Sequence, residues 1–157
     1  MKIYIAGPDV FEKNAVEIGR KYKSLCEKYG HTGLFPLDNE CSSSKEICEA
    51  NISLINKSDV VIANGNEFRG EMDVGTAFEI GFAAAKNKKI IVYMDDTASL
   101  VDKYGREDEK GRNVEDFGLP LNLMISESAE IVKGTFEDAL KKLRNCNSPT
   151  THKEVFL

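Results

Sequence analysis

The chain alternates between short apolar runs and longer segments in which apolar residues recur at helical spacing. The runs are too short for helices and contain almost no polar positions, which is typical of strands covered on both faces of a sheet. Pro36 indicates that the second run lies at an edge or a strand end, because proline donates no ladder hydrogen bond. The expected strands are residues 2–6, 34–37, 59–63, 89–94 and 130–132.

The segments between these strands predict helices. Gly30 is placed to end the first helix, and the serines at 42–44 offer hydroxyl groups to the N-terminus of the second. Residues 64–70 are expected to form a loop. Residues 102–116 carry ten charges and two glycines, which predicts a solvated loop or, alternatively, a mobile flap over a site. The expected helices are residues 11–29, 44–57, 73–85, 98–104 and 135–143.

Strands that alternate with helices are joined by right-handed crossovers and form a parallel sheet. Five strands fit the flavodoxin-like order 2-1-3-4-5. We therefore expect one α/β domain with three layers over residues 1–144, followed by a polar, flexible tail at 145–157. In such sheets ligands bind beyond the strand C-termini, at the switch point between strands 1 and 3. Residues 7–9, 38–40 and 64–73 converge on that point.

The helix at 73–85 contains one internal charge, Glu79, in an otherwise apolar or small-residue segment. A helix that is apolar almost all round is buried on more than one side. A lone carboxylate there loses several kcal/mol of hydration unless it is paired, hydrogen-bonded or protonated. Asp73 at the helix start is ~120° away from Glu79 around the helix, so the two carboxylates are expected to approach a ligand from different sides. The expected apolar face comprises Val74, Ala77, Phe78, Gly81, Phe82 and Ala85.

Composition excludes several classes of function. The net charge of −5 argues against a general nucleic-acid binder, which usually carries a basic patch. No apolar run approaches the ~20 residues of a membrane span, and residues 1–6 predict a strand rather than a signal peptide. We therefore expect a soluble, cytoplasmic protein without a membrane or nucleic-acid partner. Four cysteines without a CxxC pair, and only two histidines, predict reduced thiols and no zinc site: Cys26, Cys41, Cys48, Cys146, His31 and His152.

Carboxylate chemistry is the remaining candidate for a site. The chain has no GxGxxG or P-loop spacing, and no plausible Ser-His-Asp set. Glu79 with Asp73 nearby suits a nucleophile and a positioning or acid–base group. Carboxylates attack anomeric carbons through an oxocarbenium-like transition state and form a glycosyl ester. The alternative is structural: Glu79 pairs with Arg69 or Lys2 and stabilises a dimer interface.

Four segments occur in a recognisable order: Ile3–Pro8 (IYIAGP), Phe68–Gly70 (FRG), Asp73–Gly81 (DVGTAFEIG) and Gly118–Met124 (GLPLNLM). Together they resemble the nucleoside 2-deoxyribosyltransferase family, and its kinetoplastid-type members in particular. The resemblance covers residues 2 to about 143. It implies transfer of 2-deoxyribose between nucleobases through a covalent intermediate, with 2′-deoxynucleosides and free nucleobases as substrates and no metal or organic cofactor. Slow hydrolysis is expected, because water is an alternative acceptor.

The resemblance also implies roles for individual residues. Glu79 attacks C1′, Asp73 holds the sugar hydroxyls, and Tyr4 orients the nucleophile. Asn122 reaches the sugar 5′-hydroxyl from a neighbouring subunit, so a homo-oligomer, at least a dimer, is expected. Structural alternatives are a core position for Tyr4 and a loop cap for Asn122. Further substrate-binding residues are expected to be Gly7, Phe11, Glu40, Asn51, Gly75 and Met124, with Phe11 and Met124 as apolar walls or core residues.

Two positions differ from the lactobacillal members of the family. Glu40 stands where they have a glutamine that contacts the base, and Asn51 stands where they have an aspartate near the base. The proton donor to the departing base is therefore open between Glu40, Asp73 and water. No active-site role is carried to the segment after Asn145.

Two other functions are alternatives. One is a deoxynucleoside 5′-monophosphate N-glycosidase, whose family has a serine at the position of Asp73. A carboxylate there repels a phosphate dianion, which argues against this function. The other is a non-catalytic nucleoside-binding module.

Overall fold

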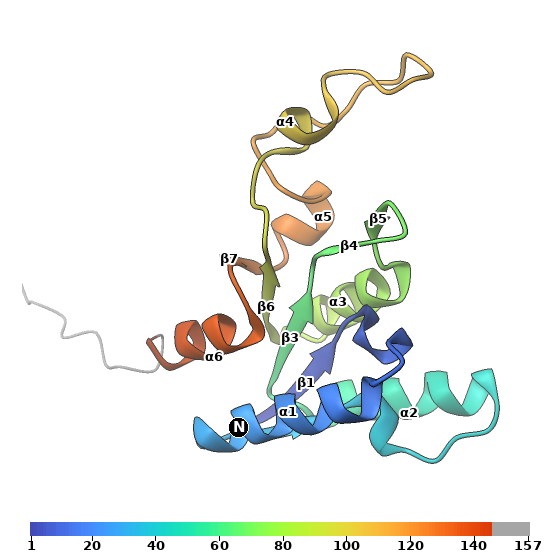
Figure 1. Cartoon of the computed structure of the whole chain (residues 1–157), viewed down its shortest axis with the longest axis vertical. Coiled ribbons are helices and arrows are strands. Elements are labelled where there is room, and N and C mark those ends of the chain that lie inside the picture. The colour runs from blue at the N-terminus through green and yellow to red at the C-terminus, as the bar shows by residue number, and fades with distance from the viewer. Residues whose placement is uncertain (146–157) are drawn as a thin grey trace, which may run out of the picture.

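The computed structural model of the chain describes residues 1–145 and contains a five-stranded parallel sheet of order β2-β1-β3-β6-β7 (Figure 1). The predicted flavodoxin-like order is confirmed, with β6 and β7 as the fourth and fifth strands. The predicted tail at 145–157, with Cys146 and His152, lies outside the described residues except for Asn145. The strands are β1 (Lys2–Ala6), β2 (Thr32–Leu34), β3 (Val60–Asn64), β6 (Lys89–Met94) and β7 (Glu130–Lys133).

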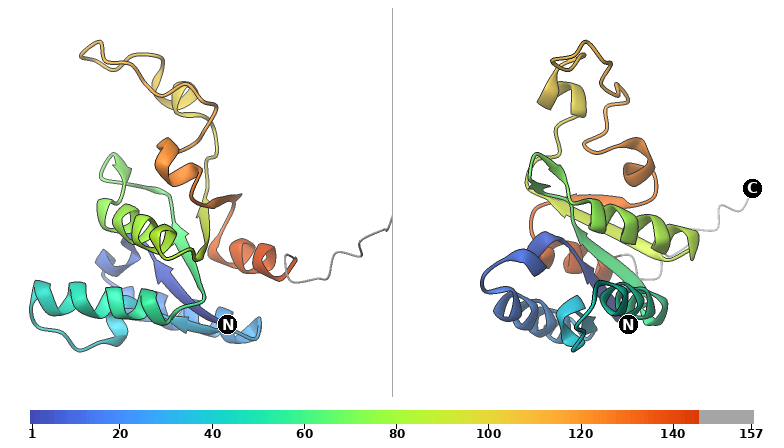
Figure 2. Two further views of the ribbon diagram at one scale, coloured as in Figure 1. Left: turned by 180° about the vertical axis from the view of Figure 1, so that it is seen from behind. Right: turned by 90° about the vertical axis from the view of Figure 1, so that its right-hand side faces the viewer.

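Helices cover both faces of the sheet, as the right-hand view of Figure 2 shows. Because side chains alternate along a strand, Ile3 and Ile5 belong to one apolar core and Tyr4 belongs to the other. The first core lies under α1 (Ala15–Lys28) and α6 (Phe136–Asn145), and the second lies under α2 (Ser44–Lys57) and α3 (Val74–Ala85). Each fully buried isoleucine contributes about 1.5–3 kcal/mol, so these alternating strand residues account for much of the stability.

The second helix begins at a capping box. The Ser43 hydroxyl accepts the Glu46 amide at 3.2 Å, and the Glu46 carboxylate accepts the Ser43 amide at 3.0 Å. Two of the N–H groups that a helix start leaves without partners are satisfied in this way. The predicted role of the serines at 42–44 is therefore confirmed for Ser43.

Two predicted boundaries are wrong, and proline explains both. The second strand was expected at 34–37 but ends at Leu34, because Pro36 begins the 3-10 helix η2 (Pro36–Asp38). The first helix was expected from residue 11, but Pro8 begins the 3-10 helix η1 (Pro8–Phe11) and α1 starts at Ala15. Proline fixes φ near the helical value and lacks an N–H, so it starts a short helical turn readily.

The expected loop at 64–70 contains a strand of a small antiparallel hairpin, β4 (Glu67–Phe68) and β5 (Glu71–Met72). Its two-residue turn has φ of 58° at Arg69 and 94° at Gly70. Positive φ at both positions is the requirement of a type I′ turn, for which Asn-Gly is the usual sequence. The hairpin was missed because Arg-Gly is a weak signal for that turn.

The expected apolar face of α3 is not the face that packs on the sheet. Val74 and Phe78 are 71% and 58% exposed, and the buried residues are Thr76, Ile80 and Ala83. Helical spacing shows which residues share a face, but this helix is apolar on nearly every side, so spacing does not identify the side that packs on the sheet. Within this single chain α3 is buried on one side only.

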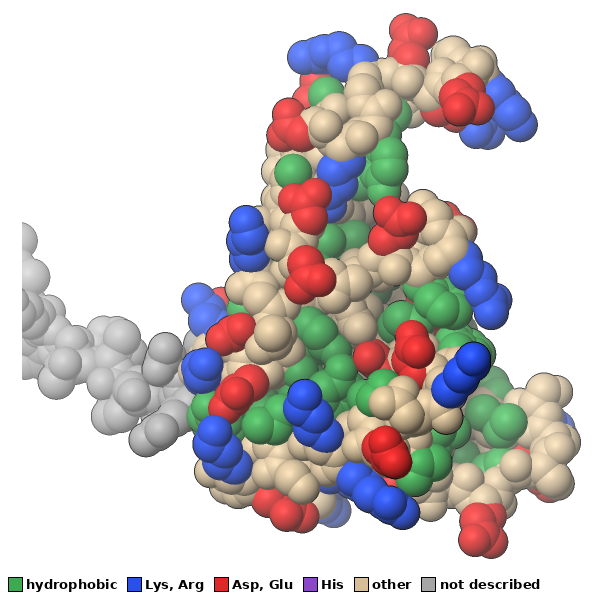
Figure 3. Space-filling view, viewed as in Figure 1, with side chains coloured by type: hydrophobic (Ala, Val, Ile, Leu, Met, Phe, Trp, Pro, Cys, Tyr) green, Lys and Arg blue, Asp and Glu red, His purple; other side chains and the backbone are tan. Residues whose placement is uncertain are grey.

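The segment between β6 and β7 projects beyond the C-terminal ends of the strands in every ribbon view (Figures 1 and 2). It contains α4 (Leu100–Tyr104) and, near its return to the sheet, α5 (Leu123–Ser126). Basic and acidic side chains are intermingled over it (Figure 3), as expected for a solvated loop. The alternative of a mobile flap stays a prediction. Within residues 1–145 no helix has both the length and the apolar character that crossing a membrane requires.

Candidate active site

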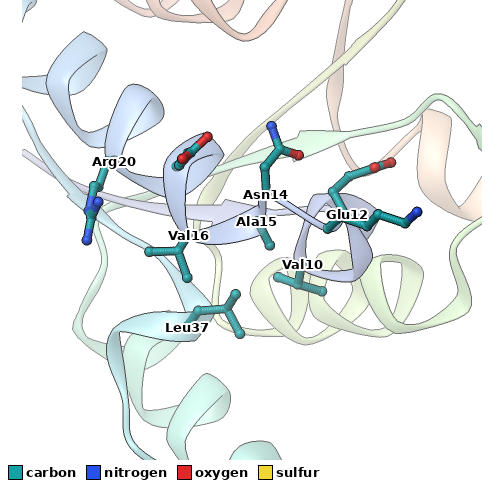
Figure 4. Close-up of a pocket in the computed structure, with 9 residues that line it drawn as sticks. Val10, Glu12, Asn14, Ala15, Val16, Arg20 and Leu37 are labelled. Atoms are coloured by element: carbon teal, nitrogen blue, oxygen red, sulfur yellow. The ribbon is translucent and has the colours of Figure 1, made fainter.

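A cavity of about 510 Å³ lies between η1, the start of α1 and η2 (Figure 4). Val10, Ala15, Val16 and Leu37 form its apolar walls, and charged residues surround them. None of the three predicted catalytic residues lines this cavity. The candidate site is therefore identified by the contacts of those residues.

Glu79 lies where β1, α2 and α3 meet. The Tyr4 hydroxyl donates a hydrogen bond to Glu79 Oε1 at 2.6 Å. The Asn51 side-chain amide donates to the same oxygen at 3.4 Å. These partners are 75 and 28 residues from Glu79 in sequence, so the sheet and helix packing brings them together.

The two oxygens of Glu79 differ. Both donors reach Oε1, and none of the hydrogen bonds described for residues 1–145 reaches Oε2. Asn51 Oδ1 is also a buried atom without a hydrogen-bond partner in that part of the chain. One carboxylate oxygen and one amide oxygen therefore remain as acceptors or nucleophilic atoms for a ligand.

Burial sets the protonation of this cluster. Burial raises the pKa of Glu79 to about 7, with the Tyr4 hydrogen bond lowering it, the Asp73 charge raising it and the Asn51 hydrogen bond lowering it. Burial also raises the pKa of Tyr4 far above its usual value, and the Glu79 charge and hydrogen bond act in the same direction. Tyr4 thus remains a protonated donor while Glu79 exchanges a proton near neutral pH.

Asp73 caps the N-terminus of α3. Its Oδ2 accepts the amide and the hydroxyl of Thr76, both at 2.8 Å. Asp73 acts on Glu79 through its charge, because no hydrogen bond is described between them. This agrees with the prediction that the two carboxylates do not stack on one helix face. Gly75 lies in the first turn, where a Cβ atom would be 3.2 Å from Asp73 Oδ2.

The turn after β1 is held by a network that sequence analysis missed. The Asp9 carboxylate accepts hydrogen bonds from the Tyr22 hydroxyl at 3.1 Å and the Asn64 amide at 2.9 Å. Asn64 in turn accepts two hydrogen bonds from Asn66, each at 3.0 Å. A Cβ atom on Gly7 would be 2.8 Å from Asn64 Cβ, so only glycine fits there. The sequence signal was the convergence of these polar residues on strand ends, which does not identify partners.

An aromatic stack joins this turn to the hairpin. The Phe11 ring lies 5.3 Å from the Phe68 ring, and the Arg69 guanidinium lies 4.6 Å from the Phe68 ring. Phe11 is 60% exposed, so its alternative role as a core residue is wrong.

Other predicted site residues are not joined to Glu79 within this chain. Glu40 is exposed between η2 and α2, and Met124 is 69% exposed on α5. Asn122 caps α5, because its Oδ1 accepts the Met124 amide at 3.0 Å. Met124 is therefore not a core residue. Within this chain Asn122 acts as a helix cap, which was its structural alternative.

Within residues 1–145, the structural alternative of an ion pair between Glu79 and Arg69 or Lys2 is not observed, and a role of Glu79 in a dimer interface stays a prediction. None of the ion pairs in the described part of the chain involves Glu79, and the Arg69 guanidinium lies over aromatic rings. The backbone amide of Lys2 donates to Asp59 at 2.7 Å. Over residues 1–145, no group of three or more His, Cys, Asp or Glu side chains is arranged to hold a metal ion.

Comparisons with known proteins find a matching family model and similar folds. Residues 3–124 match the family model described as nucleoside 2-deoxyribosyltransferase. The solved structure of 2-desoxiribosyltransferase from Leishmania mexicana is 37% identical, with a TM-score of 0.85, and the match covers 94% of this chain and 99% of that chain. The CMP N-glycosidase of Clostridium botulinum is 20% identical with a TM-score of 0.52 over 92% of this chain and 99% of that one, a likeness of fold alone.

One curated relative is also similar. An uncharacterized protein of Schizosaccharomyces pombe is 31% identical over 105 residues, which is 60% of this chain. The match covers 50% of the length of that relative.

Proposed function

Because the chain belongs to the nucleoside 2-deoxyribosyltransferase family, we propose that it transfers 2-deoxyribose between nucleobases. The observation that carries this proposal is the contact of Glu79 with Tyr4. The 2.6 Å hydrogen bond occupies Oε1, while Oε2 receives no described hydrogen bond from residues 1–145. A carboxylate held by one oxygen is oriented to attack with the other.

In the first step, Glu79 Oε2 attacks C1′ of a 2′-deoxynucleoside and forms a glycosyl ester. The N-glycosidic bond breaks with its electron pair going to the base, which takes a proton at a ring nitrogen. Tyr4 keeps its proton and its hydrogen bond to Oε1 throughout, because its pKa is far above neutral. The proton for the base comes from Asp73, Glu40 or water. The charge of Asp73 raises the pKa of Glu79, whereas Glu40 has no such effect on it.

In the second step, another base enters and its ring nitrogen attacks C1′. The bond from C1′ to Glu79 Oε2 breaks with its electron pair returning to the carboxylate, and the proton of the ring nitrogen returns to the group or water that protonated the first base. Two displacements at C1′ give retention of configuration and ping-pong kinetics. Water in place of the second base gives the free sugar and accounts for slow hydrolysis. No metal or organic cofactor takes part in the proposal.

The remaining site residues have roles as substrate contacts in this proposal. Gly7 leaves room at the turn after β1, and Phe11 offers an exposed ring. Asn51 offers its unpartnered Oδ1 to a donor on the base or sugar. Gly75 lies beside Asp73, which is the proposed partner of the sugar hydroxyls. Glu40 and Met124 are the further proposed contacts.

A homo-oligomer is part of the proposal. Val74 and Phe78 on α3 and Met124 on α5 are large apolar residues that this single chain leaves exposed. A second copy of the chain against this surface buries them and brings its Asn122 to the substrate. That arrangement explains why α3 is apolar on the side that faces away from its own sheet.

Mass spectrometry tests the covalent step. The chain is incubated with a 2′-deoxynucleoside, quenched in acid and digested, and the peptide that contains Glu79 is expected to carry one deoxyribosyl group. Addition of a free base before quenching is expected to remove the group and yield the new nucleoside. Base exchange without any trapped adduct, in a reaction that inverts configuration, would contradict the mechanism.

The two alternative functions are separated by substrate panels. Faster base release from a deoxynucleoside 5′-monophosphate than from the deoxynucleoside would favour the N-glycosidase, which the Asp73 carboxylate opposes through repulsion of phosphate. Tight nucleoside binding without adduct or base release would favour a binding module. One deoxynucleoside donor tested against all free bases also determines the preference between purines and pyrimidines.

A further inference from the structure

The contacts of Asn122 involve a residue to which no role has been assigned, Glu115. The Asn122 amide nitrogen donates a hydrogen bond to Glu115 Oε1. Glu115 Oε2 accepts the backbone amide of Leu123 at 2.9 Å. Asn122 Oδ1 accepts the backbone amide of Met124 at 3.0 Å. The carboxylate of Glu115 therefore holds both the Asn122 side chain and the first turn of α5.

These contacts leave one N–H donor of Asn122 available. A side-chain amide has one oxygen and two N–H donors. The oxygen is engaged by Met124, and one N–H is engaged by Glu115. An ionised carboxylate only accepts hydrogen bonds, so Glu115 requires the nitrogen of Asn122 to face it. The second N–H is the group that remains for a ligand.

Glu115 differs from two other acidic residues of the projecting segment, Asp116 and Asp108. Asp116 pairs with Arg106 at 2.6 Å, and Asp108 pairs with Arg112 at 2.6 Å. These pairs are exposed and stabilise little. Glu115 contacts no basic residue among the described ion pairs and instead orients an amide. Its place in the sequence suggests a solvated charge, but its contacts indicate a positioning role.

We propose that Glu115 is a positioning residue that fixes the Asn122 amide so that it presents an N–H donor to the sugar 5′-oxygen in the site of a neighbouring subunit. The inference rests on the proposed function, in which Asn122 serves that oxygen. Without Glu115, only the Met124 backbone amide holds the Asn122 side chain, so the side-chain nitrogen faces the sugar 5′-oxygen in a smaller fraction of its orientations. The hydrogen bond from the Asn122 N–H to the sugar 5′-oxygen is then formed in a smaller fraction of the bound complexes.

The test compares two donors, a 2′-deoxynucleoside and its 2′,5′-dideoxy analogue, by kcat/KM for base exchange. Asn122→Ala is expected to lower kcat/KM about tenfold for the 2′-deoxynucleoside, because one hydrogen bond is lost. It is expected to leave kcat/KM for the 2′,5′-dideoxy analogue unchanged. Glu115→Ala is expected to do the same, with a somewhat smaller loss. Glu115→Gln keeps an acceptor oxygen for the amide and is expected to recover part of the loss. Asp116→Asn, a matched change at the adjacent exposed residue, is expected to affect neither donor.

Each result decides a different claim. Equal losses with both donors in Glu115→Ala would indicate a purely structural role and overturn the inference. A loss specific to the hydroxylated donor in Asn122→Ala, but absent in Glu115→Ala, would overturn the inference and leave the role of Asn122 intact. No donor discrimination in the unmodified chain would overturn the role of Asn122 and the inference with it, while the Glu79 adduct would still stand. If Glu115→Ala does not fold, the test uses Glu115→Gln. An equal change in kcat/KM for both donors in that variant would contradict the inference.

Discussion

Glu79 and Asn122 carry the two ends of the proposed reaction in opposite environments. Glu79 contacts Tyr4 and Asn51 between the sheet and two helices, and burial raises its pKa to about 7. Asn122 is exposed at the base of the projecting segment, and its side-chain hydrogen bonds within residues 1–145 join residues near it in sequence. The proposed nucleophile is thus assembled within one chain, whereas the proposed contact with the sugar end lies on an exposed surface.

The largest expected effect is on the buried end. Glu79→Ala removes the proposed nucleophile and is expected to lower base exchange by on the order of 10⁴-fold, as loss of a catalytic nucleophile does in other enzymes. The fold is expected to persist, because the change removes a carboxylate that is costly to bury. Base-exchange assays and circular dichroism measure the two outcomes. Glu27→Ala, at an exposed position on α1, is the matched control, and near-normal exchange by Glu79→Ala would refute the assignment.

The second effect is on pH dependence. Attack requires ionised Glu79, whose pKa burial raises to about 7. The value of kcat/KM is therefore expected to rise about tenfold per pH unit well below 7, about 50-fold from pH 5 to 7, and to level above pH 8. Initial rates between pH 5 and 9 test this. A profile that levels already at the pH of an ordinary glutamate, near 4.5, would show that the burial of Glu79 does not matter for attack.

Removal of the Tyr4 hydroxyl is expected to act through Glu79. The Tyr4 hydrogen bond lowers the pKa of Glu79, so Tyr4→Phe is expected to raise that pKa and to move the rising limb of the profile to higher pH. At pH 7 the rate is expected to fall about tenfold. Tyr29→Phe removes a hydroxyl that contacts Glu137 and serves as the control. A lower rate with an unmoved limb would assign Tyr4 a role in packing alone.

Mixing two variants tests whether the exposed end serves another chain. Glu79→Ala lacks the nucleophile and Asn122→Ala lacks the amide, but in a mixed dimer one site receives both groups. Random mixing is expected to restore about a quarter of the sites. The rate with a 5′-hydroxylated donor should therefore exceed the sum of the separate rates. A rate equal to that sum would place Asn122 in the site of its own chain.

The smallest expected effect is on stability. Because the pKa of Glu79 is raised on folding from 4.5 to about 7, its contribution to stability is fully present below pH 4.5 and is lost as the pH rises through 7. Glu79→Gln is expected to remove this part of the decline. Denaturant unfolding at pH 5 and 8 measures the difference, and identical pH slopes in both proteins would contradict the raised pKa.

Much of the fold follows from the sequence. Continuous apolar runs predicted the strands, and the alternation of strands and helices predicted a parallel sheet of the observed order. Prolines at 8 and 36 moved two boundaries, because each starts a short helical turn. The hairpin at 67–72 escaped prediction, since its turn contains arginine where asparagine is usual.

The sequence by itself determined the family and singled out Glu79 as a carboxylate in an apolar helix, because motifs and periodicity are local properties. Tertiary structure alone decided which face of α3 packs on the sheet, since the helix is apolar on nearly every side. It also decided that Tyr4 and Asn51 share one oxygen of Glu79 and that Glu115 holds Asn122. Hydrogen-bond partners depend on the distance and direction of side chains in the packed chain, and spacing along the sequence carries neither.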